Sequence, residues 1–249
     1  MQLGYTGDSA PGLLTSFTDS KSTVHQFTYD ADGRLVADFS PGEGTITLAR
    51  TTTSEDAYEV EFKSAAGFTT VYGVEDLPNG ETRRVRTEPS GAATEVLVRT
   101  DGSERIAHPD GTVVDVKRGP DPRFGMHAPV PTEVVITLPG RAPAVRAASR
   151  AATVADPGDP MSLLAQTETV SVNGQIYTST FDATALEATY TRPSGRQSVY
   201  HVDAQGRPLQ YEPAGGLAPL TWTWDAAGRL TKQQQAGQSW TFAYGDAAS

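Results

Sequence analysis

WTWDAAGRL at residues 222–230 nearly repeats FTYDADGRL at residues 27–35. A looser copy, YHVDAQGRPL, occupies residues 200–209, and WTFAY at residues 240–244 begins another. The two leading aromatic or apolar residues stand at i and i+2, which places them on one face of a strand. The Asp accepts hydrogen bonds from turn amides, the Gly takes the positive φ that ends the turn, and the Arg starts the returning strand. Each copy therefore predicts a β-hairpin.

The repeat indicates which positions have a structural role: the second aromatic residue, the Asp, the Gly and the Arg of each copy. These positions are Tyr29, Asp30, Gly33, Arg34, Asp203, Gly206, Arg207, Trp224, Asp225, Gly228, Arg229 and Tyr244. A single hairpin cannot bury its own apolar face, so stacked copies must supply the core.

The chain between the copies has the same strand character. Apolar residues alternate with polar ones at residues 58–62 and at residues 134–138. Turn dipeptides with Gly in second place end at residues 80, 91, 102 and 111, a spacing that leaves room only for strand and turn. The sequence predicts an all-β fold, an antiparallel meander of hairpins.

Composition suggests three regions. Residues 1–138 carry 21 acidic and 12 basic residues, which predicts a hairpin region with an acidic, solvated surface. Residues 139–160 are rich in Pro and Ala and predict a seam or a connecting strand. Within it, Ala favours helix at residues 142–155, but alternation favours an extended segment, which we expect. We expect residues 161–249 to form a region of the hairpin repeat that is truncated in its last copy.

Composition also disfavours several classes of protein. The chain of 249 residues has a net charge of −10 and no Cys. A nucleic-acid binder needs an excess of Lys and Arg, and thiolate metal sites and disulfides need Cys. No apolar run approaches the length of a membrane span, and residues 1–12 lack the pattern of a signal peptide.

Candidate chemical sites each have a plainer structural interpretation, which we favour. Asp30 and Asp32 resemble the start of a calcium loop, but turn chemistry accounts for them. Glu59, Glu61, Glu75 and Asp76 could supply a glycosidase pair, but Glu59 and Glu61 share a wet strand face. The four His, at positions 25, 108, 127 and 201, show no metal-ligand spacing.

The aromatic pairs leave two interpretations open. Packing between repeats is the favoured one, and a platform on which sugars stack is the alternative. The residues concerned are Phe27, Tyr29, Trp222, Trp224, Trp240, Phe242 and Tyr244.

The repeat, aromatic-x-Tyr/Trp-Asp-x-x-Gly-Arg-Leu, resembles the YD repeat of bacterial Rhs and teneurin-like proteins. GPDPRFGM at residues 119–126 and the stretch at residues 167–196 are similar to other elements of these proteins. The resemblance runs from about Tyr5 to the end of the chain. It implies antiparallel sheets that spiral into a hollow β-shell, which in bacterial members often encloses a C-terminal toxin and in teneurins belongs to an extracellular adhesion protein.

The resemblance implies a non-enzymatic structural segment without cofactors, in a larger protein that is secreted or at the cell surface. Its partners would be the remaining YD repeats and an enclosed toxin or effector. The alternative is a cell-surface adhesion or carbohydrate-binding module whose exposed aromatics contact glycans or a surface partner. Complete shells are much longer than this chain, and WTFAY stops inside a copy, so we expect a fragment of a larger protein.

Overall fold

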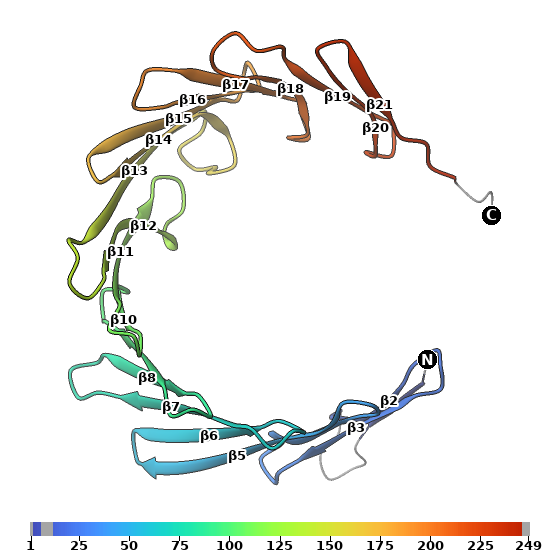
Figure 1. The fold of residues 1–249 in the computed structure, drawn as a ribbon, viewed down its shortest axis with the longest axis vertical. Coiled ribbons are helices and arrows are strands. Elements are labelled where there is room, and N and C mark those ends of the chain that lie inside the picture. Colours follow the sequence, from blue (N-terminus) through green and yellow to red (C-terminus); the bar gives the residue numbers. More distant parts are fainter. Residues whose placement is uncertain (1, 6–11, 246–249) are drawn as a thin grey trace. The chain divides into compact units, whose positions relative to one another are not determined.

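The computed structural model describes residues 2–5 and 12–245, and every regular element within them is a β-strand (Figure 1). The all-β antiparallel meander predicted from the sequence is confirmed. No helix in this described part has the length and apolarity needed to cross a membrane. Most of the residues from which the absence of a signal peptide is inferred, 1 and 6–11, lie outside the described ranges.

The 21 strands of the described residues are β1 (Gln2–Tyr5), β2 (Leu14–Thr18), β3 (Val24–Tyr29), β4 (Leu35–Ser40), β5 (Gly44–Ser54), β6 (Ala57–Lys63), β7 (Thr69–Asp76), β8 (Thr82–Thr87), β9 (Ala93–Val98), β10 (Glu104–Ala107), β11 (Val113–Asp121), β12 (Gly125–Thr137), β13 (Ala144–Val154), β14 (Leu163–Val172), β15 (Gln175–Asp182), β16 (Glu187–Thr191), β17 (Gln197–Val202), β18 (Pro208–Glu212), β19 (Leu220–Trp224), β20 (Leu230–Gln235) and β21 (Gln238–Thr241).

The chain forms two compact units. Unit 1 comprises residues 1–115 and 136–142, and unit 2 comprises residues 116–135 and 143–249. In unit 1 each strand from β1 to β10 pairs antiparallel with the next strand along the chain. In unit 2 the same holds from β13 to β21. The stretch at residues 142–155 is therefore strand, as β13, and not helix.

One turn recurs nine times in the described residues. Residue i donates its backbone N–H to the carbonyl of residue i+4, and a Gly at i+3 donates to the carbonyl of residue i. This Gly has φ between 76 and 85° at all nine turns, a region that side chains with a Cβ rarely adopt. The pattern is the three-residue hairpin loop with a bulge. The first residues of these turns are Asp30, Ser64, Leu77, Glu88, Arg99, His108, Arg192, Asp203 and Asp225.

Few side chains are buried in either unit. Val116, at 9% exposed, is the one buried apolar residue among those described, and the buried polar ones are Thr70, Ser103, Asp121 and Ser198. Strand pairing without a covering layer explains this, because each face of such a sheet remains open to water. For the same reason the alternation at residues 134–138 forms a strand without burying its apolar residues, since Ile136 and Leu138 are exposed.

The two faces of the sheet nevertheless differ in chemistry. In unit 1 the strand registers place Phe27, Leu48, Tyr58 and Tyr72 on one face, together with Arg84. In unit 2 one face carries Tyr177, Tyr190, Tyr200, Tyr211 and Trp222. We call these the aromatic face of each unit. The opposite, polar face carries Glu59, Glu61, Glu75 and Glu95 in unit 1 and cross-strand rows of Thr, such as Thr167, Thr180 and Thr189, in unit 2.

Candidate functional site

The Asp of a repeat copy closes its turn through both carboxylate oxygens. Oδ1 of Asp203 accepts hydrogen bonds from the backbone N–H groups of Gln205 and Arg207, each at 2.9 Å, and Oδ2 accepts from Nε of Arg207 at 2.6 Å. Asp225 repeats the arrangement with Arg229, at 2.9 and 2.8 Å. The Arg229 backbone amide is the main reason that the pKa of Asp225 lies below its usual 3.8.

In the first copy, two acidic side chains share the contacts that a single Asp makes in the later copies. Oδ1 of Asp30 accepts from the backbone N–H of Asp32 at 3.0 Å and of Arg34 at 2.8 Å, and the Asp32 carboxylate pairs with the Arg34 guanidinium. In the described part of the chain, no group of three or more acidic or His side chains is placed to hold a metal ion. The contacts of this segment are those of a hairpin turn.

The Arg of one copy contacts the aromatic residue of the next. Cζ of Arg207 lies 5.8 Å from the centre of the Trp224 ring, and Nε1 of Trp224 donates to the carbonyl oxygen of Pro208 at 2.8 Å. The Arg207 guanidinium also lies over the next turn, where a Cβ added to Gly228 would stand 3.3 Å from its Nη1. The register shifts between Thr223 and Trp224, which places the bulge at the indole that makes this contact.

The following pair of copies repeats these contacts. Cζ of Arg229 lies 4.7 Å from the centre of the Tyr244 ring, and the Tyr244 hydroxyl donates to the carbonyl oxygen of Leu230 at 2.9 Å. We call this combination the inter-copy clamp: an Arg beside the next aromatic ring, and a hydrogen bond from that ring to the carbonyl after the Arg. It joins hairpins that are consecutive in sequence through side chains as well as through strand pairing.

A further, partial clamp lies near the N-terminus and was not predicted from the sequence. The Tyr29 hydroxyl donates to the carbonyl oxygen of Leu14 at 2.7 Å, and Leu13 lies against Gly33 where Arg207 lies against Gly228. Gly12-Leu13-Leu14 thus stands where another copy would have Gly-Arg-Leu, with φ 93° at Gly12. The spacing of Tyr29 after Leu14, which is close to that of Tyr244 after Leu230, is the signal that could have revealed it.

The GPDPRFGM stretch forms the most buried ionic contact of unit 2. Asp121 is 5% exposed, and its Oδ1 accepts from the backbone N–H groups of Arg123 and Phe124 at 2.9 and 3.2 Å. Its Oδ2 accepts from Nη1 of Arg150 on β13 at 3.0 Å, and Nη2 of Arg150 contacts Glu168 at 3.4 Å. Burial alone would raise the pKa of Asp121, but these hydrogen bonds and the Arg150 charge hold it below 3.8.

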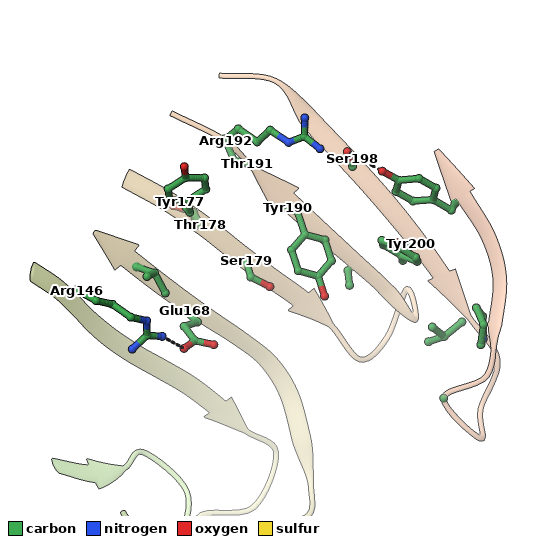
Figure 2. A pocket seen from close by; sticks show the side chains of 16 residues that line it. Arg146, Glu168, Tyr177, Thr178, Ser179, Tyr190, Thr191, Arg192, Ser198 and Tyr200 are labelled. Carbon is green, nitrogen blue, oxygen red and sulfur yellow. Dashed lines mark hydrogen bonds and ion pairs between the residues drawn. The ribbon is translucent and has the colours of Figure 1, made fainter. Parts of the chain in front are cut away.

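A groove of about 860 Å³ lies on the aromatic face of unit 2 (Figure 2). Tyr200 is its centre: its ring stacks on Tyr211 with ring centres 4.4 Å apart and meets the edge of Tyr190 at 5.7 Å. Tyr177 and Tyr190 are 44% and 46% exposed, so their rings form open walls. The charged residues that line the groove are Arg146, Glu168 and Arg192.

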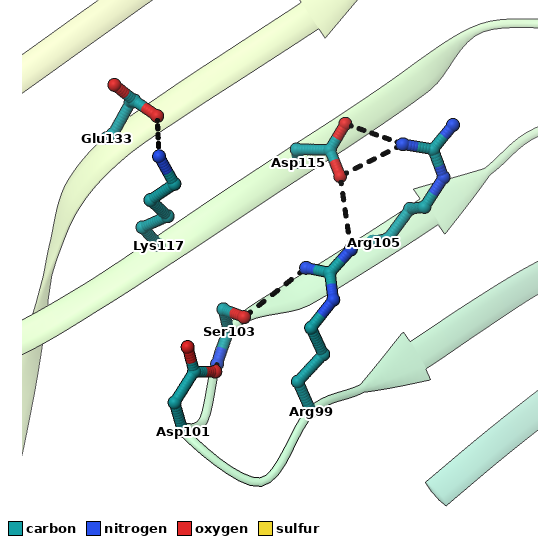
Figure 3. Close-up of polar contacts among 7 residues, drawn as sticks. All are labelled: Arg99, Asp101, Ser103, Arg105, Asp115, Lys117 and Glu133. Atoms are coloured by element: carbon teal, nitrogen blue, oxygen red, sulfur yellow. Dashed lines mark hydrogen bonds and ion pairs between the residues drawn. The ribbon is translucent and has the colours of Figure 1, made fainter. Parts of the chain in front are cut away.

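A smaller ionic cluster stabilises successive hairpins of unit 1 (Figure 3). The Asp115 carboxylate accepts from Nη1 of Arg105 at 3.0 and 3.2 Å and lies 3.8 Å from Nη2 of Arg99. Nη1 of Arg99 donates to the hydroxyl of Ser103, which is buried. Each of these four side chains has a hydrogen bond or an ion pair with another of them, which fits a structural role.

The acidic residues considered as a glycosidase pair are only partly brought together. Glu59 and Glu75 line one shallow depression of about 290 Å³ on the polar face of unit 1, above Gly73. Asp76 points to the other face, where its carboxylate accepts from the Thr82 hydroxyl at 2.9 Å. Nη1 of Arg83 contacts the Glu75 carboxylate at 3.5 Å.

The aromatic and His residues singled out in the sequence differ in their surroundings. Phe27, Tyr29, Trp222 and Trp224 are half-buried, whereas Trp240, Phe242 and Tyr244 are exposed. The strand expected at residues 240–244 is displaced, since β21 ends at Thr241. His25 contacts the Ser40 hydroxyl at 3.0 Å, and His201 lies 3.7 and 3.5 Å from Glu187 and Glu212.

Comparisons with known proteins give one family and several distant structures. A family model described as "Teneurin YD-shell" matches residues 1–248. No curated protein matches the chain. Similar solved structures include the wild-type TCP10 domain of Danio rerio CPAP, with 16% identity, a TM-score of 0.21 and coverage of 80% of this chain and 99% of that one. They also include a crystal structure of TcdB2-TccC3-TEV, with 12% identity, a TM-score of 0.25 and coverage of 86% of this chain and 16% of that one.

Proposed function

The chain belongs to the teneurin YD-shell family, and from this premise we propose that it forms a stretch of shell wall that scaffolds or encloses a C-terminal toxin or effector. The larger protein would be secreted or at the cell surface. The role is mechanical and non-enzymatic: paired strands and inter-copy clamps make a stiff wall, and the contents lie against one of its faces. This chain spans only 16% of the length of the chain in the TcdB2-TccC3-TEV crystal structure.

The inter-copy clamp is the observation that carries this proposal. Each clamp fixes one hairpin to the next along the chain, as Arg207 does with Trp224 and Arg229 with Tyr244. A globular domain would instead bury the aromatic face against a second layer. Here that face remains half exposed within each unit, which fits a wall whose covering partner is another polypeptide.

The sheet edge at β21 provides a test. In the described residues β21 pairs with β20 alone, so the N–H and C=O groups of its other edge are open to a further strand. A designed YD copy appended after residue 249 should pair with this edge. We expect the 249-residue chain to self-associate in sedimentation velocity and the lengthened chain to associate less. A monodisperse monomer that binds a defined glycan at micromolar affinity would contradict the proposal.

A second candidate function is an adhesion or carbohydrate-binding module. The exposed rings of Tyr177, Tyr190 and Trp240, the last at 48%, favour it because aromatic rings stack on sugar faces. A glycan array probed with the 249-residue chain distinguishes the two candidates. Binding that is lost in the Trp240→Ala variant would support the module, and uniform absence of binding would support the wall.

A further inference from the structure

The hairpin formed by β1 and β2 has the register of a repeat copy. Tyr5 pairs with Leu14, and the register shifts immediately before Tyr5. In the copies at residues 27–35 and 222–230, the register likewise shifts immediately before the second aromatic residue, which then pairs with the Leu that starts the returning strand. Tyr5 therefore holds the position of the ring that takes part in the inter-copy clamp.

The other half of this clamp is not found among the described residues. In the copies that follow, the hydroxyl of Tyr29 donates to the carbonyl oxygen of Leu14. The hydroxyl of Tyr244 donates in the same way to the carbonyl oxygen of Leu230. Tyr5 makes no hydrogen bond or ring contact with a described residue, and at 56% it is the most exposed Tyr of the described ranges. Its ring is thus open where the other rings of its kind are engaged.

The backbone beside Tyr5 is open as well. β1 pairs with β2 alone among the described strands, so the N–H and C=O groups of its other edge can pair with a further strand. At the corresponding edge near β21, the backbone N–H of Phe242 donates to the carbonyl oxygen of Thr231 on β20 at 2.9 Å. Phe242 stands two residues before the clamp ring of its copy, and Leu3 stands two residues before Tyr5. The backbone N–H of Leu3 is therefore the expected donor to such a strand.

We propose that the outer edge of β1 binds the returning strand of a further YD copy, which brings an Arg to the ring of Tyr5 and a carbonyl oxygen to its hydroxyl. The occupant is a strand that begins with Gly-Arg-Leu or Gly-Arg-Pro, because an Arg and the carbonyl of the next residue form both complete clamps. This inference rests on the proposed function, since it takes the chain to be a stretch of wall. It adds the residue that receives the neighbour and the contacts by which it does so.

The test repeats residues 219–239 ahead of Met1 of the full 249-residue chain. The copied Leu230 then stands 14 positions before Tyr5, the separation that Leu230 has from Tyr244. Nitration of Tyr5, followed by mass spectrometry, should fall several-fold relative to the 249-residue chain, whereas nitration of Tyr72, 41% exposed, should stay unchanged. Hydrogen exchange of the Leu3 amide should slow about tenfold or more, because an amide in a paired strand exchanges only after local opening.

Two matched extensions separate the clamp from strand pairing alone. Arg229→Gln, made only in the added copy, keeps the strand and removes the cation. The Leu3 amide should then stay protected, whereas nitration of Tyr5 should recover about two- to fivefold, as expected for loss of a cation–π contact at a partly exposed site. An extension with the same residues in scrambled order should protect neither group.

Unchanged nitration of Tyr5 beside the intact added copy, or equal protection by the scrambled one, would overturn the proposal. If the extended protein precipitates, a peptide of residues 225–239 is added to the 249-residue chain in its place, with the Arg229→Gln peptide as control. Failure of the peptide to protect Tyr5 is then the contradicting result. The added copy leaves the edge of β21 unchanged, so the sedimentation test at that edge succeeds or fails independently of this one.

Discussion

The ion pair of Asp121 and Arg150 should contribute more to the stability of unit 2 than any exposed ion pair does. Asp121→Ala removes a carboxylate that accepts three hydrogen bonds, from Arg123, Phe124 and Arg150, at 2.9 to 3.2 Å. Breaking a buried pair costs about 3–5 kcal/mol, because the remaining charge stays desolvated. Arg150 is 26% exposed and keeps Glu168, so we expect a loss of about 3 kcal/mol, near the lower limit.

Urea unfolding followed by Trp fluorescence measures this loss, since all three Trp lie in unit 2. The matched control is Glu95→Gln in unit 1, which removes a pair of similar length with Arg83, 2.7 Å, whose side chains are 42% and 44% exposed. Its own loss, followed by circular dichroism, should stay below about 1 kcal/mol. If Asp121→Ala costs no more than Glu95→Gln, burial does not strengthen the contact and the reasoning is refuted.

Three further predictions concern the repeat copies. Gly228→Val should cost more than about 1 kcal/mol in urea unfolding, because a β-branched residue resists φ near 79°, whereas Ala226→Val in the same turn should cost little. Trp224→Phe should cost about 1 kcal/mol through loss of its hydrogen bond to Pro208, and the exposed Trp240→Phe only a few tenths. Hydrogen bonds from turn amides lower the pKa of the Asp side chains in the folded state. The stabilisation of the fold by these hydrogen bonds is therefore fully present above the unfolded-state pKa of about 4, and it is lost as the pH falls through the lower pKa of the folded state. Acid titration monitored by circular dichroism should therefore show loss of strand signal only below that pH; loss beginning near pH 6 would contradict it. The groups concerned are Asp30, Asp110 and Asp225.

The sequence predicts the parts of this fold that depend on neighbouring residues. Turn chemistry is local, so Asp225 and Gly228 reveal a hairpin by their spacing alone. Alternation likewise indicates strands such as β6, where Tyr58 and Val60 lie on one face. Alternation cannot tell that Ile136 stays exposed, because it identifies a face and not the layer that would cover it.

The contacts between distant residues could not be read from the sequence. Asp121 and Arg150 are 29 positions apart, and their contact depends on the course of the chain between them. The groove needs Tyr177, Tyr190 and Tyr200 on three strands to share a face, which follows only from the registers of β15, β16 and β17. A shift of one residue in either pairing would send a ring to the opposite face.

Chemical labelling of the two faces tests the shell-wall proposal most directly. Tyr72 and Tyr190 lie on the aromatic faces of units 1 and 2, and Lys63 and Lys232 on their respective polar faces. In a longer protein that carries these residues together with further YD repeats and a C-terminal cargo, tyrosine nitration should fall several-fold relative to the 249-residue chain, because the contents of the shell would cover the rings. Lysine acetylation should be equal in the two proteins. Equal nitration of Tyr72 and Tyr190 in both would contradict the proposal that this sheet is a wall with an occupied aromatic face.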